Sequence, residues 1–247
     1  MLDDRIVKVK VKGDFACFTR PDLKVERMTY PCMTPSAARG ILDSILWKPE
    51  FHWYVRRILI LNPIRFCTIK RNEINSKQGR SPIVIEEKRA QRNSVVLRNV
   101  AYIIEASIYQ KNTSDKNRPE KYIGKKGIDA DNDGMFPRRV KKGQCWRMPY
   151  LGVREFSAEF MAPDGTEQPI QETIPIGSML FDIFYDKNGK TEPLFFHDVA
   201  IRNGVLNCEV PENNKMMQSS HFRLPIDSET SAAIYEFNQR EEKEAAL

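Results

Sequence analysis

The sequence has few of the residues from which metal centres and disulfide frameworks are built. Only five cysteines and three histidines occur among its 247 residues. The cysteines are scattered, odd in number and form no CxxC pair, so neither a disulfide framework nor a zinc knuckle is indicated. The histidines lie far apart and lack metal-ligand spacing. We therefore predict no metal site, and a reducing, cytoplasmic environment.

Motifs for cofactor and nucleotide chemistry are also missing. The sequence contains no serine-hydrolase elbow, no phosphate-binding P-loop and no GxGxxG fingerprint. The string DADNDG, from Asp129 to Gly134, matches the opening of an EF-hand calcium loop. However, Val140 occupies the twelfth position, where a bidentate Glu is required, and Pro137 the ninth. We predict an acidic surface loop at Asp129 to Asp133, and catalysis, if present, without a metal or a cofactor.

Long apolar runs are absent too. No stretch approaches the roughly 20 apolar residues that span a bilayer, and residues 1–15 lack the apolar core of a signal peptide. We therefore expect no membrane partner. The composition, 41% hydrophobic and 29% charged, is that of a globular protein long enough to bury a sizeable core. The net charge of +6 favours an anionic partner.

The N-terminal part shows strand patterns around one helix. Arg5 to Lys12 alternates charged and apolar residues, which predicts a half-buried strand. Thr34 can cap a helix that begins at Pro35, and Pro49 is expected to stop it. Further strands are expected at Trp53 to Lys70, with a bulge or a break at Pro63, and at Val95 to Tyr109.

The character of the sequence changes from Cys145 onward, where short aromatic segments alternate with Pro and Gly. The turns DKNGK at residues 186–190 and Arg202-Asn203-Gly204 indicate hairpins, because Asn-Gly tolerates positive φ. Before this part, MFPRRVKKGQ offers a short helix. Candidate strands are Arg154 to Phe160, Ser178 to Tyr185, Pro193 to Arg202 and Val205 to Val210. We predict an α+β chain with a domain at 1–145 that carries basic loops, an antiparallel β-sheet region at 146–226 and a charged tail at 227–247.

Basic and aromatic residues interleave in two stretches, residues 15–49 and the acid-free string PRRVKKGQCW. Basic pairs also occur at Lys70 and Arg71 and at Lys88 and Arg89. Arg and Lys bind phosphate, and aromatic rings stack on bases. These stretches predict an RNA or DNA surface, although a solvated charged face remains the alternative. The candidate contacts are Arg20, Lys24, Arg27, Arg39, Trp47, Lys70, Arg71, Arg138, Arg139, Lys141 and Lys142.

One reaction is compatible with this inventory, because RNA contains its own nucleophile, the 2'-OH. A protein can cleave RNA by aligning that hydroxyl with the adjacent phosphorus, removing its proton and stabilising the extra negative charge. Lys121 and Tyr122 lie in a basic segment, and Lys121 can stabilise that charge. Tyr122, with an ordinary pKa of about 10, suits positioning of a phosphate or the hydroxyl better than proton removal. Simple solvation of both residues is the alternative.

Three strings show a family resemblance: VKGDFACFTRPDLKVERMTYPCMTPSAARGILDSILWKP, LNPIRFCTIKRNEINSK and RRVKKGQCWRMPYLGVREF. They closely resemble the CRISPR-associated protein five family, in its subtype I-C (d) branch, and the match extends along most of residues 4–225. The resemblance implies the RAMP architecture, with an N-terminal ferredoxin-like (RRM-like) half and a C-terminal antiparallel β-sheet extension. It also implies an endoribonuclease that trims precursor CRISPR RNA at repeat hairpins and stays bound with the other subunits of a surveillance complex.

The catalytic residues of the family carry over in part. Described members use a Tyr near the end of the first helix and a Lys-His pair before the RRxxxGQC segment. Here the first position holds Leu46, and the pair is Lys121 and Tyr122. Three alternatives stay open: Tyr122 replaces the missing groups, His52 or Tyr54 approaches the site, or cleavage is slow or lost.

The resemblance and the residues together predict a metal-independent endoribonuclease that acts by internal attack of the 2'-OH. The products would carry a 2',3'-cyclic phosphate and a 5'-OH. A noncatalytic subunit that binds the 5' handle of guide RNA is one alternative. A duplex-DNA-binding module is another, and only the net positive charge motivates it.

Overall fold

Alternate residues of the first strand, β1 (Val7–Ala16), face opposite sides of the sheet. Its valines point into the core, and its lysines lie on the other face. Each lysine meets a carboxylate there: Lys8 and Glu105 at 3.0 Å, Lys10 and Glu167 at 2.9 Å, and Lys12 and Glu159 at 2.9 Å. The strand predicted at Arg5 to Lys12 is therefore confirmed, because period-two patterning separates a buried face from a charged one.

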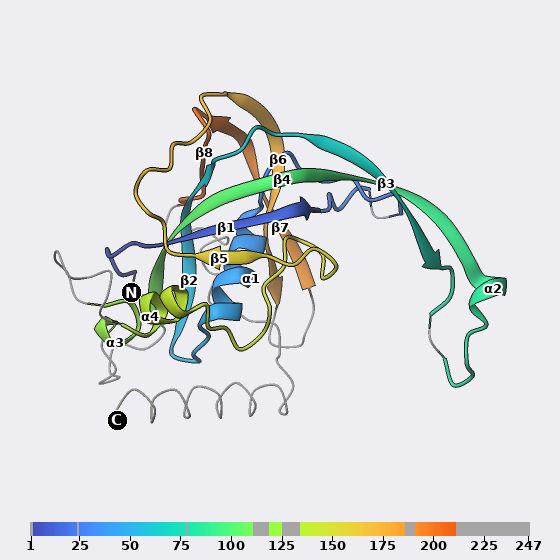
Figure 1. The fold of residues 1–247 in the computed structure, drawn as a ribbon, viewed down its shortest axis with the longest axis horizontal. Helices are drawn as coiled ribbons and strands as arrows, with labels where there is room; N and C mark the ends of the chain where they lie inside the picture. The colour runs from blue at the N-terminus through green and yellow to red at the C-terminus, as the bar shows by residue number, and fades with distance from the viewer. Residues whose placement is uncertain are drawn as a thin grey trace.

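The strands form one antiparallel sheet (Figure 1) in the computed structural model, which describes residues 2–23, 25–77, 79–110, 119–124, 134–185 and 191–210. The order is β5-β1-β4-β2-β8-β7-β6, and β3 pairs with β4 off this path. The other strands are β2 (Phe51–Ile60), β3 (Phe66–Ile74), β4 (Arg89–Gln110), β5 (Glu159–Met161), β6 (Ile174–Tyr185), β7 (Thr191–Arg202) and β8 (Val205–Asn207). The helices are α1 (Pro35–Ile45), α2 (Ile85–Lys88), α3 (Glu120–Ile123) and α4 (Met135–Lys142). The α+β class is confirmed.

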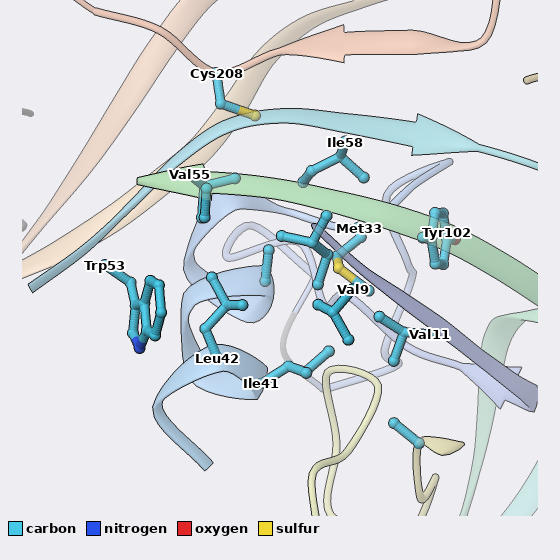
Figure 2. Close-up of a cluster of buried hydrophobic side chains, with 14 of the residues drawn as sticks. Val9, Val11, Met33, Ile41, Leu42, Trp53, Val55, Ile58, Tyr102 and Cys208 are labelled. Carbon is cyan, nitrogen blue, oxygen red and sulfur yellow. The ribbon is translucent and has the colours of Figure 1, made fainter. Parts of the chain in front are cut away.

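Helix α1 begins where the sequence predicts it to begin. The Oγ1 of Thr34 accepts a hydrogen bond from the backbone N–H of Ala37 at 3.3 Å, and Pro35 is the first helical residue. The helix ends at Ile45, earlier than the predicted stop at Pro49, because Leu46 is extended. Its apolar face packs on the sheet, where Ile41 and Leu42 lie near the β1 valines (Figure 2). This layer of α1 against the sheet forms the core.

A long hairpin arm extends from the sheet. The strand predicted at Trp53 to Lys70 is in fact two strands, β2 and β3, separated by residues 61–65, which include Pro63. Both pair with β4, β2 along its C-terminal part and β3 along its N-terminal part. As Figure 1 shows, β3 and the start of β4 curve away from the rest of the sheet, with α2 near the end of the arm.

The C-terminal strands agree with the sequence in most places. The turn between β7 and β8 has positive φ at Asn203 (48°) and Gly204 (72°), as expected for a tight hairpin. The turn predicted at residues 186–190 lies outside the described residues, although β6 and β7 pair as a hairpin would. The strand predicted at Arg154 to Phe160 is wrong for most of its length, because the backbone turns between Leu151 and Phe156.

Helix α4 confirms the short helix predicted in MFPRRVKKGQ. The strand predicted at Val205 to Val210 ends earlier, at Asn207. The segments 129–133 and 227–247, for which an acidic loop and a charged tail were predicted, lie outside the described residues. In the described part of the chain, no helix has the length and apolar character needed to cross a membrane.

A glycine pair tests the packing of the segment that follows α4. Gly152 and Gly165 have nearly the same positive φ, 86° and 84°. A Cβ on Gly152 would overlap the carbonyl of Cys17, whereas a Cβ on Gly165 would meet no atom within 4 Å. We expect Gly165→Ala to cost about 1–2 kcal/mol, from backbone strain alone. Gly152→Ala should cost about 1–3 kcal/mol more from overpacking.

Urea unfolding, monitored by circular dichroism, measures the free energy of unfolding of both glycine variants. Equal losses of unfolding free energy in the two variants would contradict the close approach of residues 17 and 152.

Candidate nucleic-acid interface

An aromatic cluster joins the end of α1 to α3 and α4 at the start of β2. The ring of Tyr122 lies 5.1 Å from that of Phe51, and Phe51 lies 5.3 Å from Trp53. Trp53 in turn lies 4.7 Å from Phe136 on α4. All four rings are at most 3% exposed. This cluster fixes the short helix α3 against the body of the protein.

The two predicted catalytic residues have different environments. Lys121 is exposed on α3, whereas Tyr122 is only 2% exposed. Arg5, in the N-terminal segment, fixes the end of α3: its Nη1 donates a hydrogen bond to the carbonyl of Gly124 at 2.7 Å. Arg5 is itself paired with Asp3 at 2.7 Å. The lysine is therefore presented to solvent from a fixed turn, and the tyrosine belongs mainly to the core.

Leu46 lies at the other side of the same cluster. It is fully buried, and its carbonyl accepts a hydrogen bond from Nε1 of Trp53 at 2.8 Å. Through Trp53 and Phe51, the position is connected to Tyr122. Leu46, where the sequence resemblance leads us to expect the family tyrosine, therefore adjoins the cluster that carries α3, and its side chain has no hydroxyl.

His52 and Tyr54 lie on the opposite face of β2 from Phe51 and Trp53, because strand side chains alternate. The hydroxyl of Tyr54 accepts from the backbone N–H of Val210 at 2.9 Å and donates to the carbonyl of Val210 at 3.3 Å. Burial raises the pKa of Tyr54, which makes the phenol a weaker acid and its ionised form scarcer. Both side chains therefore point away from the aromatic cluster that carries α3.

The cations of α4 divide into one buried residue and three that reach the surface. Arg139 is fully buried and donates from Nη1 to the carbonyl of Ile45 at 2.7 Å, so it holds α4 to the end of α1. Arg138 is half-buried, and Lys141 and Lys142 are exposed in the last turn. Positive charge there also complements the helix dipole. Of the four α4 candidates for phosphate binding, only Arg139 is inaccessible to a ligand.

Arg39 is engaged within the fold. Its guanidinium forms two hydrogen bonds with Asp182 on β6, at 2.7 and 2.8 Å, and a third with Asp43 at 3.2 Å. Its side chain is 19% exposed, and that of Asp182 is 6% exposed. Burial by itself would lower the pKa of Arg39, but the two carboxylates outweigh burial and raise it. In this arrangement Arg39 joins α1 to the C-terminal strands.

Other predicted cations form ion pairs at the base of the arm. Arg27 lies 3.4 Å from Glu73 and 3.9 Å from Glu155, and Arg71 contacts the same two carboxylates. Arg20 pairs with Asp22 at 3.1 Å. Their charges are therefore partly compensated.

The remaining predicted contacts are an aromatic residue and two lysines. Trp47 is half-buried just after α1, and Lys70 is exposed on β3. Lys24 lies outside the described residues. Lys70 is therefore the predicted arm residue that presents its charge to solvent.

The arm carries the excess positive charge of the chain. Residues 65–98 contain nine Lys and Arg and three Asp and Glu, a net +6 that equals the net charge of the whole sequence. The basic pairs Lys70–Arg71 and Lys88–Arg89 pointed to this region in the sequence. They did not show that its net charge equals that of the whole chain. A charge count over the segment would have found it. Because alternate residues of β3 are exposed along the whole strand, this face of the arm offers a basic surface.

Comparison with known proteins identifies the family. A family model described as CRISPR-associated protein (Cas_Cas5) matches residues 6–200. A protein of Thermus thermophilus named CRISPR pre-crRNA endoribonuclease Cas5d is 42% identical over 222 residues, which cover 83% of this chain and 91% of the relative. A protein of the same name from Mannheimia succiniciproducens is 38% identical over 225 residues, which cover 81% and 93%.

Two solved structures share the fold at low sequence identity. One is a functionally uncharacterized protein from Streptococcus mutans, with a TM-score of 0.58, 19% identity, and coverage of 83% of this chain and 93% of that one. The other is a CRISPR-associated protein, with a TM-score of 0.57, 21% identity, and coverage of 85% and 94%. The family match spans most of the described sheet, and both curated relatives exceed one third identity over four fifths of the sequence. The chain therefore belongs to the Cas5 family of CRISPR-associated proteins, in its subtype I-C (d) branch.

Proposed function

We propose that this protein is a metal-independent endoribonuclease that cleaves precursor CRISPR RNA at repeat hairpins. The observation that carries the proposal is the identity of 42% and 38% with two proteins named as pre-crRNA endoribonucleases, over nearly their whole lengths. The exposed Lys121 supports it, because its backbone lies on α3, whose end is held by Arg5, and a cation there is suited to stabilise transition-state charge.

The proposed reaction uses the 2'-OH of the RNA as nucleophile. The 2' oxygen forms a bond to the adjacent phosphorus, and the bond from phosphorus to the 5' oxygen breaks. One proton leaves the 2'-OH and one is delivered to the 5' oxygen, so the products carry a 2',3'-cyclic phosphate and a 5'-OH. Lys121 stabilises the negative charge on the phosphoryl oxygens. Tyr122 orients or deprotonates the hydroxyl, with its ring held by Phe51.

The basic arm supports binding of the RNA before and after cleavage. Its net charge of +6 between residues 65 and 98 suits a polyanion, and the exposed lysines at the end of α4 add to it. We propose that the cleaved RNA stays bound and that the protein acts as a subunit of a type I-C surveillance complex. RNA affinity should therefore fall steeply with salt.

We further propose that the N-terminal half is ferredoxin-like. Supporting this, the strand order β5-β1-β4-β2 has α1 between β1 and β2 along the chain, and α4 between β4 and β5. That is the βαββαβ arrangement of the fold. On this proposal β5 is the last strand of the half, which extends beyond the boundary at residue 145, and β6 to β8 are the C-terminal extension.

A second candidate function is an RNA-holding subunit that cleaves slowly or not at all. Two observations favour it: Leu46, where the resemblance leads us to expect the family tyrosine, is an aliphatic core residue, and Tyr122 is 2% exposed. In this case the protein would bind the 5' handle of guide RNA without processing it. The experiment below separates the two candidates.

Incubation with a labelled repeat hairpin in excess EDTA tests the proposal. We expect cleavage to persist in EDTA, because no step needs a divalent metal, and the product ends to be a cyclic phosphate and a 5'-OH. Once sequencing of the product has mapped the cleaved bond, a 2'-deoxy substitution at that nucleotide should abolish the reaction. An intact hairpin would support the RNA-holding subunit. Cleavage of the deoxy substrate would exclude attack by the 2'-OH.

A further inference from the structure

A pocket of about 530 Å³ lies at the opposite end of β1 from α3. It is lined by Asp14, Phe15, Arg65, Arg98 and Asn99. Its volume falls within the range of about 300–1,000 Å³ found for small-molecule sites. Its wall comes from the end of β1, from β4 and from the linker between β2 and β3. The pocket is therefore separate from the cluster that carries Lys121.

The backbone around this pocket is fixed in an unusual conformation. Asn99 has φ of 51°, a left-handed value that is uncommon outside glycine. As a result the neighbours Arg98 and Asn99 are both exposed, although strand side chains normally alternate. Asn62 donates from Nδ2 to the carbonyl of Asn99 at 2.9 Å, and the N–H of Arg98 donates to the carbonyl of Arg65 at 2.9 Å. These two hydrogen bonds with the linker between β2 and β3 thus stabilise the irregular backbone of β4 at residues 98 and 99.

The two arginines of the pocket differ from those elsewhere in the fold. Arg65 and Arg98 are exposed, and neither guanidinium makes an ion pair or a side-chain hydrogen bond with any described residue. By contrast, Arg39 and Arg71 are each bound to carboxylates. Two free planar donors beside one pocket suit phosphate oxygens, because guanidinium groups bind them bidentately.

Phe15 gives the pocket an aromatic wall. Its side chain is 36% exposed, and its ring lies 5.7 Å from that of Phe156, which supports it from one side. In the pairing of β1 with β4, Phe15 lies directly opposite Arg98. A supported, partly exposed ring next to an unpaired arginine is the combination that binds a base and its phosphate in single-stranded nucleic acid.

We propose that this pocket holds one unpaired nucleotide of the bound RNA. The base stacks on Phe15, and Arg65 and Arg98 bind the flanking phosphates. The carboxylate of Asp14 is an acceptor only, so it favours a base whose exocyclic amino group offers two N–H donors over uracil, which offers only its ring N3–H. The proposal takes RNA as the ligand from the proposed function, but it assigns a binding site away from the proposed catalytic lysine.

Fluorescence anisotropy with labelled eight-nucleotide oligo(A) and oligo(U) tests the pocket. Stacking of a base on an aromatic ring accounts for about 5- to 150-fold in affinity, so Phe15→Ala should weaken oligo(A) binding by that factor. Each lost phosphate contact should reduce the slope of log K against log salt by about 0.7 for a single strand, so Arg65→Gln with Arg98→Gln should reduce it by about 1.4. Asp14→Asn should narrow the preference for oligo(A) over oligo(U).

Matched controls lie outside the pocket. Met148, which is 64% exposed, lies outside both the pocket and the basic arm, and Arg202 is an exposed arginine at the end of β7. Met148→Ala and Arg202→Gln should bind oligo(A) within about twofold of the unmodified protein. If Phe15→Ala fails to fold, the two exposed arginines decide the test, because their substitution removes no packing.

Equal affinities and salt slopes for the pocket variants and the controls would overturn the proposal. So would a loss of binding to a protein subunit of the complex with no change in RNA affinity, because the occupant would then be a protein. The oligonucleotide-binding test of the pocket does not depend on whether the protein cleaves RNA. If the protein cleaves the hairpin but the pocket variants bind the oligonucleotides unchanged, only the nucleotide-pocket proposal is rejected. If binding depends on Phe15 but no cleavage occurs, only the endoribonuclease proposal is rejected.

Discussion

Lys121→Ala is expected to lower the rate of repeat cleavage by about 10²- to 10³-fold, the usual effect of removing one donor that stabilises transition-state charge. The side chain is exposed on α3, so its loss should leave the fold intact. One lysine among 39 Lys and Arg should also contribute little to RNA affinity. Single-turnover cleavage at saturating protein measures the cleavage rate, and a separate binding titration measures the RNA affinity.

Lys12 provides the matched control for this prediction. It is an exposed lysine on β1 whose partner, Glu159, is also exposed, so Lys12→Ala removes the same charge without a cost in packing. Its cleavage rate should equal that of the unmodified protein. An equal loss of rate in Lys12→Ala and Lys121→Ala would mean that the effect is general charge reduction, and it would remove Lys121 from the mechanism.

Tyr122→Phe separates the hydroxyl from the ring. The ring packs on Phe51 in the core, and phenylalanine preserves that contact. If the hydroxyl orients or deprotonates the nucleophile, the rate should fall by about 10²-fold, the lower end of the range for groups that transfer protons. An unchanged rate, with an unchanged melting temperature, would assign Tyr122 to the core alone.

Asp182→Ala is expected to lower the free energy of unfolding by about 3–5 kcal/mol, because it removes one partner of a largely buried ion pair. Arg39 would keep its charge beside a half-buried Asp43 and lose two hydrogen bonds. The pair joins α1 to β6 across 143 residues of sequence. Urea unfolding monitored by circular dichroism measures the loss.

Asp22→Ala is the control, since Asp22 pairs with Arg20 at the surface and both side chains are more than 40% exposed. Surface pairs contribute little, so its stability should hardly change. Replacing both partners, as Arg39→Met with Asp182→Leu, should recover part of the loss, because no charge is left buried. A loss in Asp182→Ala no larger than that in Asp22→Ala would show that the buried pair does not hold α1 to β6.

The local elements of this fold could be predicted from the sequence because their signals act over a few residues. The alternation along β1, the cap at Thr34 and the Asn203-Gly204 turn each depend on backbone geometry within one element. The strand predicted at Arg154 to Phe160 was wrong because that prediction, too, depended only on a local pattern. The segment REFSAEF, with aromatic residues at positions 156 and 160, resembles a strand, but the hydrogen bond from the N–H of Leu151 to the carbonyl of Phe156 closes a turn there.

The sequence by itself determined that the protein is basic, that it lacks the common cofactor and metal motifs, and which lysine and tyrosine to consider for chemistry. Only the tertiary structure decided which of its cations face solvent. Arg139 is buried against Ile45, 94 residues away, and Arg39 against Asp182, 143 residues away. Composition does not reveal such pairs, because the accessibility of a charge depends on contacts between distant parts of the chain. The same physical reason explains why Arg65 and Arg98 lie beside one pocket with no ion pair to any residue that the structure describes.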